Sequence, residues 1–199
     1  MAELLDAWFD QASQDFSPKT VLETRGFIDR NLRSALGTVP LTVQYGHVYA
    51  NGEDGSDEVG FYAVVVEEIF VEGCAGSDSG VTEVGPSADD LAQALLDQPG
   101  STKNGPFATT LGGYPATRID LAVPDGFDLA PCNASDIGLQ IWYSAPADKN
   151  FVLLKNATAN VYIVDIDGAR QVFLTQSGIA APQELAELQE ILDSIRIES

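Results

Sequence analysis

The sequence predicts an α+β protein, in which an N-terminal helical hairpin precedes an antiparallel β-sheet domain packed by two helices. Three observations support this prediction. Apolar residues recur at helical spacing as far as Leu36. After Leu41 the pattern changes to the alternation typical of strands, with turn signals between the runs. Two later segments, 88–97 and 182–196, return to helical spacing. We therefore expect a helical piece over 1–42 and a sheet domain of six to eight strands over 43–199.

The chain is strongly acidic, and the charge is unevenly distributed. Its 30 acidic and 10 basic residues give a net charge of −20. Residues 1–42 hold six acids and four bases, which leaves 24 acids and six bases, a net −18, for residues 43–199. A surface of this charge repels phosphate backbones and anionic membranes, and it suits cations or basic partners.

Two helices are predicted in the first 42 residues. The second begins at Pro18, after the N-cap residue Ser17, and ends before Gly37, which is typical of the position that follows a helix. Its basic residues Lys19, Arg30 and Arg33 lie together opposite the apolar stripe. From the residues alone, this pattern indicates a helical hairpin with a solvated basic face.

The segment ELLDAWFDQASQDFSPKTVLETRGFIDRNLRSALGTVPL also resembles the start of the core-binding, SAM-like domain of tyrosine recombinases (phage integrases). The similarity covers about forty residues and includes Leu-x-x-x-Trp, the Ser17–Thr20 motif SPKT and the Leu36-Gly37 stop. The resemblance implies weak DNA contact through hydroxyl and basic side chains. The matching candidates are Ser17, Lys19, Thr20, Arg30 and Arg33.

The chain departs from that family in ways that exclude recombinase chemistry. The family domain is a bundle of about four helices, whereas the pattern here stops after two. Its catalytic domain needs several arginines, a His-x-x-Arg element and a tyrosine nucleophile, but the single histidine, His47, is followed by Val48-Tyr49-Ala50. The net −18 of the following domain further opposes DNA binding. We therefore expect DNA contact to be weak or lost.

The longest apolar run, Val59 to Cys74, predicts one central strand buried on both faces. Cys74 and Cys132 are the two cysteines, and their spacing fits no zinc or redox motif. A disulfide between them needs an oxidising compartment, which the lack of a recognisable signal peptide argues against. The pair is therefore either a disulfide or two buried thiols.

The remaining elements follow from local signals. Residues 43–49 indicate a strand, and the acidic segment 51–58 indicates a solvated turn rather than a calcium loop, whose ligand spacing it lacks. Ser87 is the expected N-cap of the 88–97 helix, and Pro182 opens the last one. The other predicted strands are 107–111, 114–123, 139–143, 161–164 and 171–175, with turns at Gly112-Gly113 and Asp167-Gly168.

Residues 43–199 resemble an uncharacterised domain of actinobacterial exported proteins and lipoproteins. The similarity is carried by TEVGPSADDLAQALLDQPG, TLGGYPATRIDLAVP, IVDIDGARQVFLTQ and ELQEILDSIRIE. It implies a disulfide between the two cysteines and an extracytoplasmic setting, and it assigns no activity. No apolar run is long enough to span a membrane, and no basic region precedes an apolar one at the start, so the chain as written is expected to be cytoplasmic.

Motifs for catalysis are lacking. There is no glycine-rich phosphate loop, no His-Glu-x-x-His and no nucleophile beside a base, and His47 is expected to be structural. The glycosylation-type triplets at Asn133 and Asn156 matter only in a secretory setting. We therefore expect no enzymatic activity, no cofactor and no metal.

Two functional hypotheses follow. In the first, the chain is a non-catalytic relative of integrases whose N-terminal helices retain weak DNA contact or have lost it. In the second, the acidic domain is an extracytoplasmic-type binding or interaction module with a protein partner and no role with nucleic acid. The first is preferred here because that family alone has a known activity.

Overall fold

A computed structural model describes residues 45–50, 59–132, 137–144, 149–178, 182–195 and 197, with backbone alone for 45–50 and 149. The predicted helical hairpin of 1–42 and the acidic turn of 51–58 lie outside the described residues.

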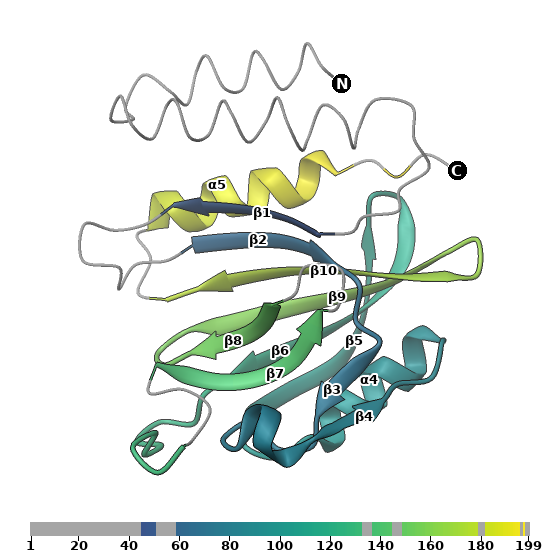
Figure 1. The fold of residues 1–199 in the computed structure, drawn as a ribbon. Helices are drawn as coiled ribbons and strands as arrows, with labels where there is room; N and C mark the ends of the chain where they lie inside the picture. Colours follow the sequence, from purple (N-terminus) through teal and green to yellow (C-terminus); the bar gives the residue numbers. More distant parts are fainter. Residues whose placement is uncertain are drawn as a thin grey trace.

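The described part of the chain forms two antiparallel sheets (Figure 1). The six-stranded sheet contains, in spatial order, β1 (Tyr45–Ala50), β2 (Val59–Val64), β10 (Ala169–Ser177), β9 (Thr158–Ile166), β6 (Tyr114–Ala122) and β5 (Thr102–Leu111). The four-stranded sheet contains β4 (Val81–Glu83), β3 (Glu68–Phe70), β7 (Gly138–Ser144) and β8 (Lys149–Leu154). The helices are η3 (Gly76–Ser79, 3-10), α4 (Ala88–Asp97) and α5 (Pro182–Ser194).

The α+β prediction, an N-terminal hairpin followed by a sheet packed by two helices, is therefore wrong: the described chain is mostly β and has two sheets. The error arises at the apolar run 59–74, which is two strands rather than one. β2 ends at Val64 in the six-stranded sheet, and β3 begins at Glu68 in the four-stranded sheet. Val66, between them, is 1% exposed. The residues on both sides of this passage are apolar because the chain crosses the core from one sheet to the other, and the polar pair Glu67-Glu68 stands where β3 begins.

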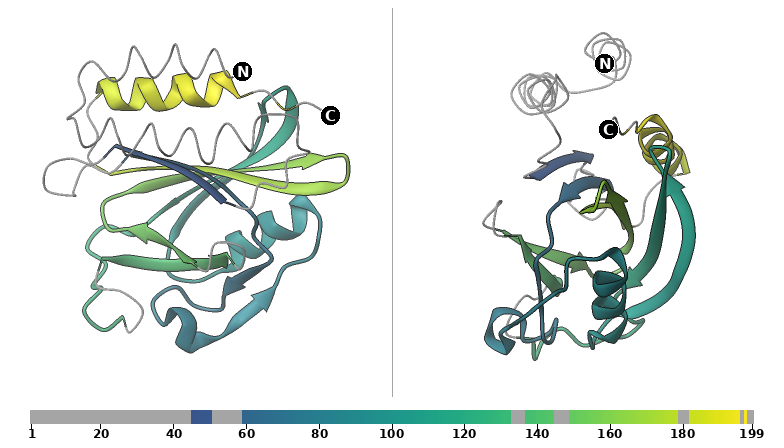
Figure 2. Two further views of the ribbon diagram at one scale, coloured as in Figure 1. Left: turned by 45° about the horizontal axis from the view of Figure 1, so that its top comes forward. Right: turned by 90° about the vertical axis from the view of Figure 1, so that its right-hand side faces the viewer.

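The main core lies between the two sheets and α4 (Figure 2). Alternate residues of β2, β6, β9 and β10 point into it, such as Val161 and Ile163 of β9, as the period of two requires. From the four-stranded sheet, Trp142 stacks on Phe151 with ring centroids 4.4 Å apart. β8, which carries Phe151, was not predicted from the sequence.

A second, smaller core covers the opposite face of the six-stranded sheet. There α5 contributes Leu192, which packs with Leu111, Tyr162, Val164 and Phe173. The predicted apolar stripe of α5 is correct for Leu188 and Leu192, which are buried, while Leu185 is 44% exposed. The six-stranded sheet therefore buries apolar side chains on both faces.

Several local predictions are confirmed. α4 occupies 88–97 with Ser87 as its N-cap, and α5 begins at Pro182. The hairpins β5–β6 and β9–β10 turn at the predicted Gly112-Gly113 and Asp167-Gly168, where all four residues have positive φ. Within the described ranges, no helix has the length and apolar character needed to cross a membrane.

Candidate binding groove

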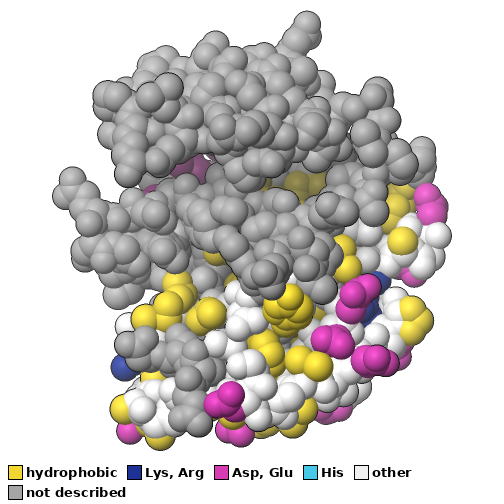
Figure 3. Space-filling model, viewed as in Figure 1, with side chains coloured by type: hydrophobic (Ala, Val, Ile, Leu, Met, Phe, Trp, Pro, Cys, Tyr) yellow, Lys and Arg dark blue, Asp and Glu magenta, His cyan; other side chains and the backbone are white. Residues whose placement is uncertain are grey.

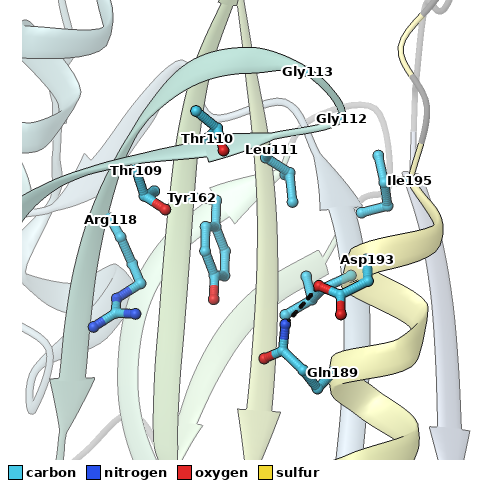
Figure 4. Close-up of a pocket in the computed structure, with 11 residues that line it drawn as sticks. Thr109, Thr110, Leu111, Gly112, Gly113, Arg118, Tyr162, Gln189, Asp193 and Ile195 are labelled. Atoms are coloured by element: carbon cyan, nitrogen blue, oxygen red, sulfur yellow. Dashed lines mark hydrogen bonds between the residues drawn. The ribbon is translucent and has the colours of Figure 1, made fainter.

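A groove of about 490 Å³ lies between the β5–β6 hairpin and the C-terminal half of α5 (Figure 4). Its lining comes from three parts of the chain that are far apart in sequence. They are the hairpin with Arg118 of β6, Tyr162 of β9, and the last turns of α5. The lining residues are Thr109, Thr110, Leu111, Gly112, Gly113, Arg118, Tyr162, Gln189, Leu192, Asp193 and Ile195.

One end of the groove is fixed by the tip of the hairpin. Gly112 and Gly113 have φ of 59° and 93°, the left-handed conformation that a two-residue hairpin turn favours. The chain that follows α5 passes close by, and the Ile197 N–H donates to the Gly112 carbonyl at 3.4 Å. A Cβ on Gly112 would lie 2.7 Å from Cγ1 of Ile197. Glycine is therefore required here by both backbone conformation and space.

The charged groups on the sheet side are paired. Nε of Arg118 lies 2.9 Å from Oδ1 of Asp120, two residues further along β6 and on the same face. Asp120 also accepts a hydrogen bond of 2.8 Å from Nδ2 of Asn160, its cross-strand neighbour on β9. The guanidinium lies over the ring of Phe107, 5.0 Å from the centroid. These contacts hold Arg118 against the sheet and leave little net charge there.

Tyr162 lies between Arg118 and the residues of α5 (Figure 4). Burial raises the pKa of its phenol, while the nearby Arg118 guanidinium opposes this shift and Asp120 and Asp193 add to it. The hydroxyl therefore stays protonated at neutral pH and can both donate and accept a hydrogen bond. On α5, Nε2 of Gln189 donates to Oδ1 of Asp193 at 2.9 Å.

The groove thus presents hydroxyl, amide and paired charged groups above aliphatic side chains. This combination can hold a polar molecule by hydrogen bonds at several points. Within the described ranges, no group of three or more His, Cys, Asp and Glu side chains is placed to hold a metal ion.

Cys74 and Cys132 form a disulfide, with S–S 2.09 Å and Cα–Cα 4.7 Å. Both cysteines pack against the main core between the sheets, on the other side of the six-stranded sheet from the groove. The bond links the segment after β3 to the loop that follows β6. Its role in this position is structural.

The predicted DNA contacts Ser17, Lys19, Thr20, Arg30 and Arg33 lie outside the described residues, so that hypothesis stays a prediction. His47 is in β1, where the backbone alone is described. Asn133 is also outside the described residues, and Asn156 is exposed in the turn between β8 and β9.

The groove was not predicted from the sequence, although the hairpin and α5 were each predicted separately. One usable signal was present: Arg118 and Asp120 are two apart on a strand, which places both on one face of the sheet. The approach of α5 to that face depends on tertiary packing, which no local pattern encodes.

Comparisons with known proteins do not add an identity. No protein-family model matches the chain, and no curated protein matches it. The resemblances of the N-terminal segment and of residues 43–199 therefore remain predictions.

Proposed function

We propose that the two-sheet domain is a non-catalytic binding module, and that the groove between α5 and the β5–β6 hairpin takes a small neutral ligand rich in hydroxyl groups. The observation that carries this proposal is that the groove's basic residue is already neutralised by the protein, through the 2.9 Å contact of Arg118 with Asp120. Paired charged groups can still form directional hydrogen bonds with a ligand, and the ligand does not need to carry an opposite charge.

Charge argues against an anionic ligand. The chain carries −20 overall, and Figure 3 shows many acidic and few basic side chains on the described surface in that view. Asp193 adds a carboxylate to the groove lining itself. An anion would therefore approach against the field of the molecule and meet a guanidinium that Asp120 already occupies.

Size and lining fit a compact ligand. A volume of about 490 Å³ falls within the ~300–1,000 Å³ usual for small-molecule sites. Leu111, Leu192 and Ile195 supply apolar contact, and Thr109 and Tyr162 supply hydroxyls. A lining that combines apolar side chains with hydroxyl groups suits a saccharide, whose ring carbons and hydroxyls offer both kinds of contact.

The test is a ligand titration followed by amide NMR shifts, using glucose, N-acetylglucosamine and their di- and trisaccharides as probes. We expect saturable shifts confined to the amides of 109–113 and 189–195. Inorganic phosphate and spermidine serve as the anionic and cationic comparisons. Shifts produced by either of these, with none from the neutral sugars, would refute the proposed ligand class.

The matched variants are Tyr162→Phe, which removes one hydroxyl from the groove, and Tyr143→Phe, which changes a tyrosine on the four-stranded sheet. We expect Tyr162→Phe to weaken sugar binding by roughly 5- to 10-fold, as for loss of one hydrogen bond of about 1 kcal/mol. Tyr143→Phe should leave the affinity unchanged. Equal effects of the two variants would show that binding is not at the groove.

A further inference from the structure

Strand β5 is an exposed edge of the six-stranded sheet. It runs for 10 residues, pairs with β6 on one side, and has no strand on the other side within the described residues. Most of its residues are exposed, including Phe107 at 37%. A long exposed edge of this kind offers its unpaired backbone groups to another strand.

The other edges of the described sheets are less open. β4 has three residues, and it includes Glu83. At β8, the Leu154 N–H donates to the side-chain oxygen of Gln176 on β10, at 3.3 Å. That contact occupies the end of the β8 edge. Of the edges whose side chains are described, β5 therefore has the longest stretch available for pairing.

The register of the hairpin identifies which backbone groups point outward. Leu111 pairs with Tyr114 across the two-residue turn, and such a flanking pair is hydrogen-bonded. Because hydrogen-bonded and non-hydrogen-bonded pairs alternate, Thr109 and Phe107 also point their backbone groups at β6. Ala108 and Thr110 point theirs away from the sheet. Pro115 lies opposite Thr110, at a position that needs no N–H.

The first half of β5 is protected against strand addition, while the second half is not. The register with β6 shifts between Asn104 and Phe107, and Pro106 within that interval offers no N–H. After it comes Phe107–Leu111, FATTL, a regular five-residue stretch without charge. Its β-branched and aromatic residues favour strand pairing.

Charge selects the occupant of this edge. The sequence has no Asp or Glu from Gln98 to Ile119, so β5 carries no acid on a molecule of charge −20, and the one acid of its hairpin partner β6, Asp120, is paired with Arg118. Two copies of this chain repel each other over acidic surfaces, and that repulsion is smallest where acids are missing. The β5 edge is therefore a surface that a second copy can approach with little charge repulsion.

We propose that β5 pairs with β5 of a second copy, antiparallel and centred on Thr109, to join the two six-stranded sheets. In this register Ala108 lies opposite Thr110 of the other copy, and the two exchange both backbone hydrogen bonds. The two-fold axis repeats the exchange, which gives four bonds in all. Phe107 lies opposite Leu111 of the second copy on the same face of the sheet, where Leu111 is 5% exposed and packs in the smaller core.

Five residues per chain make a small interface, so the dimer should be weak, with a dissociation constant on the order of 10⁻⁴ M. Its salt dependence is diagnostic. Because salt screens the repulsion between two molecules of −20, raising NaCl from 50 to 500 mM should tighten the dimer severalfold. An association driven by opposite charges would weaken over the same range.

The test is sedimentation equilibrium of the full chain up to about 1 mM at both salt concentrations, with a matched pair of variants at one position. Ala108→Pro removes an outward N–H that β6 does not use, and Ala108→Ser keeps it. We expect Ala108→Ser to dimerise like the parent chain and Ala108→Pro to lose at least tenfold in affinity. Thermal melts of both variants check that the fold is intact.

Hydrogen exchange gives a measurement that needs no substitution. The amides of Ala108 and Thr110 should exchange more slowly at high protein concentration, while those of the flanking Gly113 should not. A chain that stays monomeric at 1 mM in 500 mM NaCl overturns the proposal. A dimer that persists in folded Ala108→Pro, with these two amides unprotected in the parent chain, also overturns it. Pairing of the edge with an unrelated extended peptide and not with itself would overturn it as well.

Discussion

The side-chain amide of Gln98 donates a hydrogen bond of 2.8 Å to the carbonyl oxygen of Ile141. The same nitrogen donates to the carbonyl of Phe70 at 2.7 Å. The pairing of β3 with β7 stops after Ile69 and Trp142, so Phe70 and Ile141 are the next residues of the two strands. Gln98, the C-cap residue of α4 and 4% exposed, thus extends the contact between these strands with its amide.

Replacing Gln98 by Met should be strongly destabilising, because it leaves two buried carbonyls without this donor. Each buried carbonyl left without a donor costs about 1–3 kcal/mol, and partial relaxation of the structure recovers some of this cost. We therefore expect the free energy of unfolding to fall by about 2–4 kcal/mol. Urea unfolding measures it. Gln93→Met on the exposed side of the same helix, where Gln93 bonds Asp97 one turn away, is the control and should cost under about 0.5 kcal/mol. Equal midpoints for the two variants would contradict this role for Gln98.

The N-terminus of α4 should respond to acid through Asp90. Ser87 Oγ accepts from the Asp90 N–H at 3.1 Å, and the Asp90 carboxylate accepts from the Ser87 N–H at 3.0 Å. The side-chain and backbone hydrogen bonds from Ser87 hold the pKa of Asp90 below its usual value, with a smaller contribution from Arg170. A lowered folded-state pKa stabilises the protein above the unfolded value of about 3.9, and that stability is lost as pH falls through the folded pKa.

An NMR titration of the carboxyl carbons should therefore place the Asp90 pKa below the ordinary value for an aspartate. Ser87→Ala removes the largest cause and should shift the Asp90 titration upward, and it should cost about 1 kcal/mol of stability at neutral pH. Ser194→Ala, at the far end of α5, is the control for removing an exposed serine. An Asp90 titration unchanged by Ser87→Ala would contradict the capping box as its cause.

The disulfide should contribute substantially to stability. The two cysteines are 58 residues apart in the sequence. For a loop of this size the chain-entropy model gives a stabilisation of about 4 kcal/mol, and measured stabilisations by disulfides are typically about 2–4 kcal/mol. The double variant Cys74→Ser/Cys132→Ser should lower the free energy of unfolding by this amount. For comparison, the parent chain is unfolded with and without reductant. Adding reductant should lower its free energy of unfolding by as much as the double variant does. A reductant effect on the double variant itself would show that another process is being measured.

How far the sequence predicts this fold depends on whether the signal is local. The α4 helix was predicted correctly because Ser87 caps it and its apolar residues follow one stripe. The β5–β6 and β9–β10 hairpins were predicted because glycine occupies turn positions that need positive φ. In each case the deciding residues lie within a few positions of one another.

The two-sheet arrangement and the groove could not be predicted in this way. The run 59–74 contains Glu67 and Glu68 at the passage from β2 to β3, but β3 itself begins at Glu68, so these acids do not locally mark a change of sheet. That passage is fixed from a distance by Arg170, which donates to the Val66 carbonyl from 104 residues away. The groove likewise needs α5 beside the hairpin, a contact between residues such as Gly112 and Ile197.

Arg170 should therefore be important for joining the two sheets. Its guanidinium donates to the carbonyls of Val66 and Gly85, and to that of Ser87 at 3.1 Å. Burial lowers the pKa of Arg170, while Asp90 and Glu67 oppose the shift, and an arginine remains charged at neutral pH. Arg170→Lys keeps the charge but not the fork that reaches separate carbonyls, so we expect a loss of about 1–3 kcal/mol. The exposed Lys155→Gln should be nearly neutral in the same urea experiment.

Tyr162 should make the stability of the domain fall at high pH. Burial is the main cause that raises its pKa, so the folded state disfavours the phenolate relative to the unfolded chain, where the pKa is about 10. A raised folded-state pKa contributes stability that is complete below the unfolded value and is lost as pH rises through the folded one. The free energy of unfolding should therefore decline above about pH 10, and less steeply in Tyr162→Phe than in the parent chain. Absorbance at the phenolate band, compared between the two proteins, isolates this tyrosine from the others. The difference in phenolate absorbance between the parent chain and Tyr162→Phe reports the ionisation of Tyr162. If this ionisation occurs at or below about pH 10, burial in the groove does not control the hydroxyl, and the proposal that it is a neutral donor to a ligand is refuted.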